Sequence, residues 1–592
     1  MHQLEVWRRQ SYKPRDDRSL QEWAKGVRLP AAYSITGPFD LNRSPWLKRQ
    51  WDALDDPLVR EITCIASPRT GKTMGADLFL CKMVAHNALP MMFNLGNEED
   101  AHEHAQTRFI PLLRAVPDVR AKFTGNDNDI TKKLVRFIDG GYIVIQGIKN
   151  PNNFDGKGIC ILINDDCHKA PRGNIGKAKS RTGDFRHKCK VLNIAQGGIV
   201  GDDMDVEYQR GTQEVFGWRC PKCGTLQPFE WQDKNGEYRI KYDQNEVTCP
   251  EGKWNFDELA KTIRYECANP ACDLAFFDTE EDRKRQTYDF GEFLPPENPN
   301  APRDTVSIHW NQLCIPWIPW KEIVIDWIES MAASEMGDNS KLINFIQRRL
   351  AQNWDPSKEP TFRITEDAPE SDYMLGDPWP DEVQRFMACD VQEKGGRHFV
   401  CVARAFSADG QSRLVWAGKL DSYEQIEAKR QELQISGARV GIDAAHDQEG
   451  IGSACAKYNW MALIGSDQAA WPHQVVNGKG IRETVYKHFS EGKKVWAGVG
   501  TKEQALRRFY WRFFWSRPVF SDILHRRMSG KSLYWGVPGD VTECSRYPDP
   551  NHPGENKLTS YWPQLRSWQK IKKRDKQTGV ERPLWTRIGS RQ

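Results

Sequence analysis

The sequence predicts an α/β protein with a parallel sheet in its front part and a second sheet in its last third. Between residues 61 and 196, short apolar segments alternate with segments of helical spacing. Such alternation predicts a parallel sheet with helices on both faces. From residue 385 the pattern changes to three strand-like segments in succession, then a polar helix and a fourth strand. This change separates a front part from a last part of the chain.

The composition is that of an ordinary soluble globular protein. Of the 592 residues, 39% are hydrophobic and 28% are charged, and the net charge is +4. No apolar run approaches the ~20 residues that a membrane-spanning helix needs, and the N-terminus lacks the apolar core of a signal peptide. We therefore expect a cytosolic protein that does not enter a membrane.

A phosphate-binding loop is predicted between the first strand of the front part and the helix that follows it. The segment reads ASPRTGKT and differs from the P-loop pattern GxxxxGK[ST] only at Ala66, where glycine is usual. In this context the backbone N–H groups and the helix N-terminus hold phosphates, Lys72 reaches the β- and γ-phosphates, and Thr73 holds Mg²⁺. The predicted nucleotide contacts of the loop are Ser67, Arg69, Thr70, Gly71, Lys72 and Thr73.

A P-loop needs an acidic partner on a neighbouring strand, and the segment GICILINDDCHKAP supplies one. Its apolar run ends in Asp165 and Asp166. We expect Asp165 to hold the magnesium through its water shell, as in Walker B sites. Asp166 stands where a carboxylate could orient the attacking water. The alternative interpretation is a strand that simply ends in a polar turn.

Four of the fifteen cysteines form a compact pattern in the middle of the chain. CPKCG carries Cys220 and Cys223, and CANPAC carries Cys267 and Cys272. Two such short turns are typical of a tetrahedral zinc site, and four thiolates leave no open position for water. We therefore predict a structural zinc ion. Cys249 competes for one ligand position, and four buried thiols without a metal are the alternative.

The last part predicts a second acidic site. Its three strands, helix and fourth strand follow the order of the front half of a ribonuclease-H-like domain, in which strands one and four are neighbours. Asp390 ends the first strand and Asp443 the fourth. Two carboxylates held together attract cations, which is the geometry of two-metal phosphodiester hydrolysis with Mg²⁺ or Mn²⁺. The alternative is two surface aspartates. Candidates for a third carboxylate are Asp447, Asp540 and Glu543.

Proline-rich segments 295–304 and 358–373 indicate linkers between packed units. The resulting fold class is α/β, with a P-loop ATPase domain, a small zinc-knuckle insertion and a C-terminal ribonuclease-H-like nuclease domain. The predicted boundaries are 1–60 for the approach to the ATPase, 61–215 for the P-loop ATPase, 216–280 for the zinc module, 281–375 for a connecting region and 376–592 for the nuclease.

Together these motifs resemble the large terminase subunit of lambda-type tailed phages, the terminase GpA family, along nearly the whole chain. The run WAKGVRLPAAY…SPWLKRQWDALDDPLVREITCIASPRTGKT, the knuckle CPKCGTLQPFEW, and DVQ followed by GID carry the resemblance. It implies that Trp46 and Gln50 lie at an adenine contact. It also implies a motor that hydrolyses ATP to move double-stranded DNA into a prohead, and an endonuclease that cuts concatemeric DNA.

The same resemblance implies partners and a location. They are a small terminase subunit, the portal protein of the prohead and further copies of this chain on the portal, all in the host cytoplasm. The chain departs from the family pattern at the coupling segment, which reads Asn193-Ile194-Ala195-Gln196, and at Asp166, where glutamate is usual. The family commonly continues beyond RPLWTRIGSRQ with an Asn-His and a further acidic residue. A longer chain or another carboxylate is therefore expected to complete the nuclease.

Two other classes of protein are weighed against this motor. A helicase-like ATPase fused to a repair nuclease would need a second motor domain, and the zinc module and the nuclease occupy that space. A zinc-bearing capsid or scaffold protein that only binds DNA would not need a P-loop with an acidic strand. Nucleotide binding that is lost in Lys72→Ala separates the motor from the scaffold.

Overall fold

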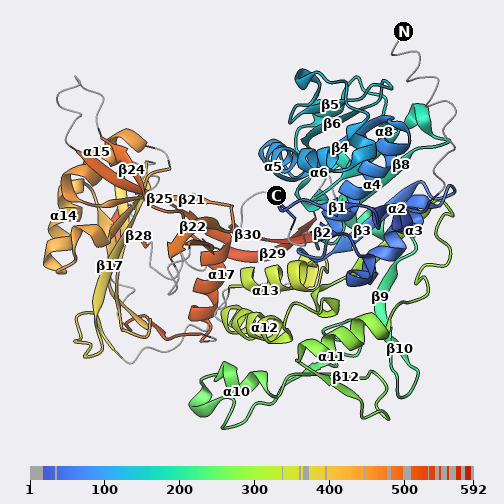
Figure 1. The fold of residues 1–592 in the computed structure, drawn as a ribbon. Helices are drawn as coiled ribbons and strands as arrows, with labels where there is room; N and C mark the ends of the chain where they lie inside the picture. Colours follow the sequence, from blue (N-terminus) through green and yellow to red (C-terminus); the bar gives the residue numbers. More distant parts are fainter. Residues whose placement is uncertain are drawn as a thin grey trace. The chain divides into compact units, whose positions relative to one another are not determined.

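The computed structural model divides the chain into two compact units (Figure 1). Unit 1 comprises Met1–Ile328 and Ile343–Pro356, and unit 2 comprises Glu329–Leu342 and Ser357–Gln592. The structure describes residues 18–33, 37–335, 338–358, 362–363, 373–393, 396–445, 447–476, 482–497, 508–530, 532–539, 546–548, 556–558, 568–574 and 581–587. Among these residues, no helix has both the length and the apolar composition that crossing a bilayer requires.

Unit 1 is built on one wide, mostly parallel sheet with the strand order β10-β9-β15-β3-β8-β7-β4-β6-β5. The strands from β9 to β6 in this order are parallel, and β10, β14 and β5 add antiparallel edges. Their bounds are β3 Glu61–Ala66, β4 Pro90–Leu95, β5 Leu134–Arg136, β6 Tyr142–Gly147, β7 Ile161–Asn164, β8 Lys190–Ala195, β9 Glu214–Arg219, β10 Leu226–Pro228, β14 Gly291–Phe293 and β15 Thr305–Trp310.

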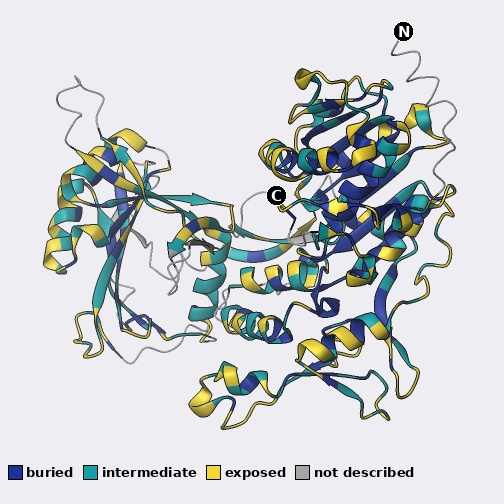
Figure 2. Cartoon of the chain, in the orientation of Figure 1, coloured by how far each residue is buried: buried dark blue, intermediate teal, exposed yellow. Residues whose placement is uncertain are grey.

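Helices cover both faces of this sheet, as the alternating pattern predicts. Two neighbouring residues of β4 belong to different hydrophobic clusters, one on each face of the sheet. Phe93 is in the cluster that contains residues of α4 (Lys72–Asn87), and Met92 is in the cluster that contains residues of α8 (Asn174–Ser180). The central strands are buried almost throughout (Figure 2), as parallel strands covered on both faces must be. The predicted α/β class is therefore confirmed.

The main sheet of unit 1 includes strands from outside the predicted ATPase segment 61–215. Strand β15 comes from the segment predicted as a connecting region, yet it pairs with β3 over its whole length. Strand β10 and part of β9 come from the predicted zinc module. The strands enter the sheet out of chain order, and local hydrophobic periodicity carries no information about such long-range pairing.

The remaining elements of unit 1 are short. The helices are α2 Leu20–Ala24, α3 Lys48–Asp55, α5 Glu98–His104, α6 Ile110–Ala115, α7 Pro117–Arg120, α9 Asp203–Arg210, α10 Phe256–Ala260 and α11 Glu280–Lys284. A pair of strands, β1 Arg28–Leu29 and β2 Gly37–Pro38, and a small antiparallel sheet of β11 Ile240–Lys241, β12 Arg264–Glu266 and β13 Ala275–Phe277 complete it. Helices α12 Trp320–Glu335 and α13 Ser340–Asn344 belong partly to each unit.

Unit 2 holds a mixed sheet with the order β24-β25-β21-β20-β17-β18-β19-β26. Strands β17 Gln384–Gln392, β18 His398–Phe406 and β19 Ser412–Leu420 are antiparallel neighbours, and α14 Tyr423–Glu432 leads to β20 Val440–Asp443, which runs parallel to β17. The predicted succession of three strands, a helix and a strand is therefore present, with strands one and four side by side.

Further strands and helices surround this sheet. They are α15 Gln448–Tyr458, β21 Met461–Ser466, β22 Trp471–Val476, β23 Arg482–Lys487, β24 Lys493–Trp496, β25 Phe509–Ser516, α17 Arg517–Met528 and β26 Trp535–Gly536. Strands β27 Arg546–Pro548 and β28 Asn556–Leu558 pair with each other. Strands β16 Phe362–Arg363, β29 Trp568–Arg574 and β30 Glu581–Arg587 form one small sheet.

Candidate functional site

The predicted phosphate-binding loop lies at the carboxyl end of β3 and leads directly into α4. Gly71 adopts a positive φ of 82° at the N-cap of that helix, a conformation that glycine adopts without strain. The Lys72 ammonium folds back and donates to the Ala66 carbonyl at 3.1 Å, closing the loop on itself. Lys72 is almost fully buried, and burial is the main reason that its pKa is lowered.

Hydroxyl groups inside the loop are used to hold its shape. Thr70 donates to the Ser67 carbonyl at 2.8 Å, and Ser67 donates to the Arg349 carbonyl at 2.9 Å. Both side chains are buried, and the Ser67 backbone N–H donates to the Trp310 carbonyl at 3.3 Å, so both hydroxyl groups and this N–H are used within the protein. Arg69, in contrast, is exposed and has a positive φ of 66°.

Two buried tryptophans support the loop from outside it. Trp46 donates to the Thr70 carbonyl at 2.8 Å, and Trp310 on β15 donates to the Thr70 hydroxyl at 2.9 Å. Trp46 is fully buried, so the structure places this residue, expected near an adenine, against the P-loop backbone. Gln50 is also fully buried, and its amide has no hydrogen-bond partner among the described residues.

The acidic strand β7 ends beside the loop. Strand β8 lies between β3 and β7, which brings the carboxyl ends of all three strands to one edge of the sheet. There the Thr73 hydroxyl donates to the Asp165 carboxylate at 2.5 Å. Asp165 is buried, and burial followed by the nearby charge of Asp166 raises its pKa.

Asp166 is held in a different environment from its neighbour. Its backbone is left-handed, with a φ of 55°, and its carboxylate accepts from Lys169 at 2.9 Å. Burial acts to raise the pKa of Asp166, but His168 and Lys169 outweigh it and hold this pKa below its ordinary value. The Lys169 ammonium also reaches the carboxylate of Asp100 at 3.2 Å, so it bridges two acids.

Three buried asparagines form a row across the strands, at the level of the residue that precedes Asp165. This row was not predicted from the sequence. Asn94 on β4 donates to Asn164 on β7 at 2.7 Å, and Asn164 donates to Asn193 on β8 at 2.8 Å. The three residues are opposite one another in the strand register. In the sequence, each member is an asparagine within an apolar strand or at its last position. Such an asparagine usually indicates only that the strand ends, so the pattern did not predict the row.

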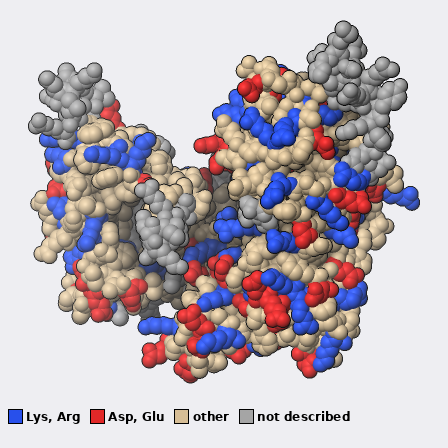
Figure 3. Space-filling model, in the orientation of Figure 1, with Lys and Arg blue, Asp and Glu red and all other residues tan. Residues whose placement is uncertain are grey.

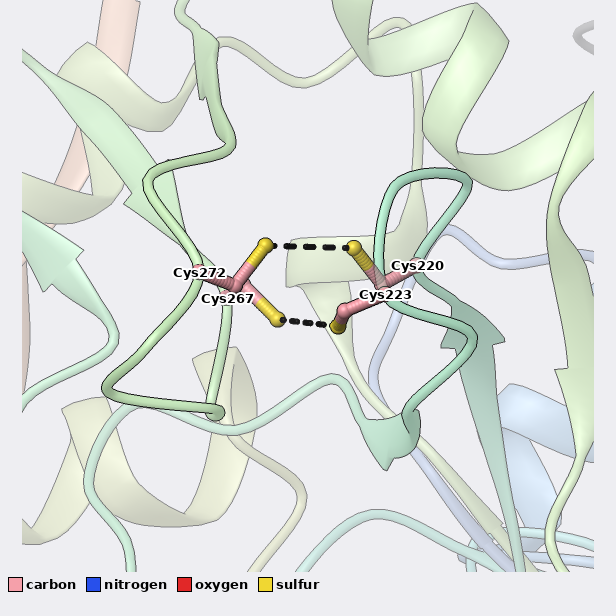
Figure 4. A group of neighbouring side chains, drawn as sticks. All are labelled: Cys220, Cys223, Cys267 and Cys272. Carbon is pink, nitrogen blue, oxygen red and sulfur yellow. Dashed lines mark hydrogen bonds between the residues drawn. The ribbon is translucent and has the colours of Figure 1, made fainter.

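The four predicted zinc ligands come together, and Cys249 does not join them. The Sγ atoms of Cys220, Cys223, Cys267 and Cys272 all lie within 4.8 Å of one another, and this is the only group of three or more metal-capable side chains found in the described part of the chain. Two facing loops carry them (Figure 4), one after β9 and one between β12 and β13. The cluster thus ties the small sheet to the loop between β9 and β10 at the edge of the main sheet.

The spacing of these sulfur atoms suits a zinc ion. The distances are 3.8 Å from Cys220 to Cys272 and 3.6 Å from Cys223 to Cys267. Four thiolates at the usual Zn–S distance of about 2.3 Å from a tetrahedral ion would stand roughly 3.8 Å apart. Gln227 donates to Cys267 at 3.4 Å, which is the kind of outer hydrogen bond that orients a thiolate ligand.

In unit 2, Asp390 and Asp443 are neighbours across two parallel strands. Cys389 pairs with Ile442 in the β17–β20 register, and the next residues along these strands are Asp390 and Asp443. Parallel strands lie about 4.8 Å apart, so both carboxylates project from one small area of the sheet. Asp443 ends β20 as expected, whereas β17 continues past Asp390 to Gln392. Asp390 accepts from Gln392 at 2.5 Å.

The candidate third carboxylates do not complete this pair among the described residues. Asp447 caps α15 by accepting from the Gly450 N–H at 2.9 Å, and it forms an ion pair with Arg397 at 2.7 Å. Asp540 and Glu543 lie outside the described residues. Asp390 and Asp443 therefore form a two-carboxylate arrangement in the part of unit 2 that the structure describes.

Unit 1 defines the class of protein. A lysine-bearing loop between a parallel strand and its helix, with a buried aspartate at the end of a nearby parallel strand, is the arrangement of a P-loop ATPase. Residues 34–291 match the model of the family described as phage terminase large subunit gpA, ATPase domain. Over these residues the chain is similar to the ATPase domain of phage terminase large subunits.

Known relatives extend the comparison. The large terminase subunit of Escherichia phage lambda is 23% identical over 340 residues, which are 52% of this chain and 49% of that protein. The chain thus matches about half the length of this relative. The large terminase of a thermophilic bacteriophage has a TM-score of 0.33 at 11% identity, over 72% of this chain and 82% of that chain. For the bacteriophage HK97 large terminase the values are 0.33 and 10%, over 77% and 80%.

Proposed function

We propose that ATP is hydrolysed by the residues that meet at the ends of β3 and β7. The backbone of the loop and the side chains of Arg69 and Lys72 bind the phosphates, and Thr73 and Asp165 hold Mg²⁺. The hydroxyl and carboxylate oxygens of these two residues already adjoin, and Mg²⁺ prefers oxygen ligands of this kind. When bound, the ion neutralises charge on the β- and γ-phosphates.

Asp166 is the residue that we propose to orient the attacking water. Its lowered pKa keeps the carboxylate ionised at neutral pH, so that it can accept a hydrogen bond from water. The ion pair with Lys169 occupies the same carboxylate. Because Lys169 also contacts Asp100, a small shift of its ammonium toward Asp100 would free Asp166 without leaving the lysine unpaired.

The cysteine cluster is proposed to bind one structural zinc ion. The support is the close approach of the four sulfur atoms, all within 4.8 Å of one another, and the position of the cluster between two sheets. With four thiolates the ion has no open position for water, so it would stabilise the fold and take no part in ATP hydrolysis.

For unit 2 we propose a metal-dependent endonuclease with a ribonuclease-H-like fold. The supporting observations are the strand order around β17 and the adjacent carboxylates of Asp390 and Asp443. Carboxylates at this spacing suit Mg²⁺ or Mn²⁺, which would stabilise the attacking and leaving oxygens of a phosphodiester. The reaction is the cutting of concatemeric DNA.

The whole protein is proposed to be a DNA-packaging motor. The observation that carries this proposal is an ATPase domain of the terminase family joined in one chain to the second acidic site. Partners would be double-stranded DNA, a small terminase subunit and the portal of a prohead, with several copies of this chain on the portal. On the face seen in Figure 3, basic and acidic side chains are interspersed, and this proposal takes no support from surface charge.

The test is packaging with purified components. Proheads, small subunit, DNA and this chain are mixed with ATP, and the DNA that becomes resistant to nuclease is measured. We expect protection with ATP and none with a non-hydrolysable analogue. ATP turnover without any protected DNA, combined with separation of duplex strands by the chain alone, would favour the helicase-like alternative instead.

A further inference from the structure

A segment far along the chain returns to unit 1 and lies on the P-loop. This segment, residues 343–356, follows the start of α13, and its backbone is bonded to the loop because Ser67 donates to the Arg349 carbonyl at 2.9 Å. The Arg349 guanidinium donates to Gln312 at 2.7 Å, and Gln312 donates to the Pro68 carbonyl at 3.1 Å. Two connections therefore hold Arg349 against the loop.

Gln347, two positions before Arg349, is held by hydrogen bonds to the residues that follow β8. Gln347 accepts from the Gly197 N–H at 3.0 Å and donates to the Gly198 carbonyl at 2.7 Å. A Cβ on Gly197 would come within 2.9 Å of the Gln347 Cα, so the two backbones are in close contact. Gly198 in turn lies beside His168, the second residue after Asp166.

Arg348 stands between these two anchors. It is exposed, and among the described residues it has neither a hydrogen bond nor an ion pair. Its neighbours in the chain place it between the P-loop, which Arg349 contacts through Ser67, and Gly198, which Gln347 contacts and which lies beside His168. An exposed arginine on a segment that is bonded to the P-loop can reach an anion bound there, and a guanidinium suits the oxygens of a phosphate.

We propose that Arg348 binds the γ-phosphate of ATP and so completes the nucleotide site from the 343–356 segment. This inference rests on the nucleotide site proposed above and adds a residue to it. An arginine placed here stabilises the charge that builds up on the transferred phosphoryl group, as arginine does in other P-loop enzymes. Because the γ-phosphate is lost on hydrolysis, Arg348 distinguishes ATP from ADP.

The test is nucleotide binding by the full chain. Affinities for ATPγS and for ADP are measured with Mg²⁺ for wild type, Arg348→Ala, Arg348→Lys and Arg186→Ala. Arg186 is an exposed arginine in the turn before β8, at the far end of that strand from the site, and serves as the matched control. We expect Arg348→Ala to bind ATPγS about 10- to 100-fold more weakly, because a hydrogen bond to a charged group is lost.

The expected pattern is selective. The affinity of Arg348→Ala for ADP stays within about twofold of wild type. The affinity of Arg348→Lys for ATPγS lies between those of wild type and Arg348→Ala. Arg186→Ala binds both nucleotides as wild type does. Wild-type affinity of Arg348→Ala for ATPγS, or an equal loss for both nucleotides, would overturn the proposal. Wild-type protein that binds neither nucleotide would overturn the proposed ATP site itself, and this inference with it.

Discussion

Thr73 and Asp165 are 92 positions apart in the chain, yet the hydroxyl of one donates to the carboxylate of the other at 2.5 Å. The contact exists because β8 lies directly between β3 and β7 in the sheet, so the helix that follows β3 begins beside the end of β7. It brings together the two side chains that the proposed mechanism assigns to Mg²⁺. The phosphate-binding loop and the acidic strand thus form one site.

Lys72→Ala is expected to remove ATP turnover. The ammonium is the buried cation of the proposed phosphate site, and we expect kcat to fall at least about 100-fold, as it does when a preorganised charge-stabilising group is lost. Steady-state phosphate release checks it. Lys177→Ala, on the exposed side of α8, is the control and keeps full turnover. Equal turnover in wild type and Lys72→Ala would refute the site.

His168 predicts how stability depends on pH. Burial is the main cause that lowers its pKa from 6.5 to about 4. The unfolded chain therefore takes up a proton near pH 6.5 and the folded protein only near pH 4, so stability is complete above this window and falls as the pH falls through it. The loss is at most about 3 kcal/mol, at roughly 1.36 kcal/mol per pKa unit.

The measurement is denaturant unfolding at about pH 7.5 and about pH 5 for wild type and His168→Gln, on either side of the ordinary histidine pKa. Wild type should lose more stability between the two pH values than the variant. The comparison with the variant is needed because Asp77 raises the pKa of the buried His104 against the effect of burial, which gives a pH dependence of opposite sign. Identical losses in both proteins would contradict the prediction.

The asparagine row is expected to stabilise the edge of the sheet that carries the site. Asn164→Leu keeps the size of the side chain but leaves the Asn94 amide and the Asn193 carbonyl oxygen buried without a partner. Each of these two orphaned groups costs about 1–3 kcal/mol, so we expect a loss of roughly 2–6 kcal/mol in denaturant unfolding. Asn152→Leu, at an exposed position, should change stability little. A loss in Asn164→Leu below about 0.5 kcal/mol, the usual range of surface substitutions, would argue against this function of the row.

Local sequence predicted the parts of the site that lie within one strand–loop–helix unit. The P-loop, the acidic strand and the cysteine turns are short patterns whose chemistry depends on spacing alone. The insertion of β15 beside β3 and the return of residues 343–356 to the loop could not be predicted, because both depend on pairing between distant segments. The asparagine row was missed for a related reason: the hydrogen bonds that join its side chains run from one strand to the next.

Purified, reduced protein is expected to contain about one zinc per chain. Cys220→Ser should lower the zinc content and the thermal stability, because one of four ligands is lost between the two sheets. Cys249→Ser should change neither, since Cys249 lies outside the cluster. Metal analysis and thermal unfolding check both variants. Full-length protein without zinc, or equal effects of the two substitutions, would refute the metal site.

Asp390→Asn is expected to abolish Mg²⁺- or Mn²⁺-dependent cleavage of DNA and to leave ATP turnover unchanged. The substitution keeps the shape of the side chain and removes one of two adjacent negative charges, which are what would attract the cations. Plasmid nicking with added Mn²⁺ measures the first activity, and phosphate release measures the second.

Asp381→Asn is the matched control for this experiment, because Asp381 is an exposed acid shortly before β17. It should cleave like wild type. Asp443→Asn should behave like Asp390→Asn, since the two carboxylates are proposed to hold the same ions. Cleavage by Asp390→Asn at the wild-type rate would remove the proposed nuclease site. Loss of ATP turnover in the same variant would show instead that the substitution disturbs more than unit 2.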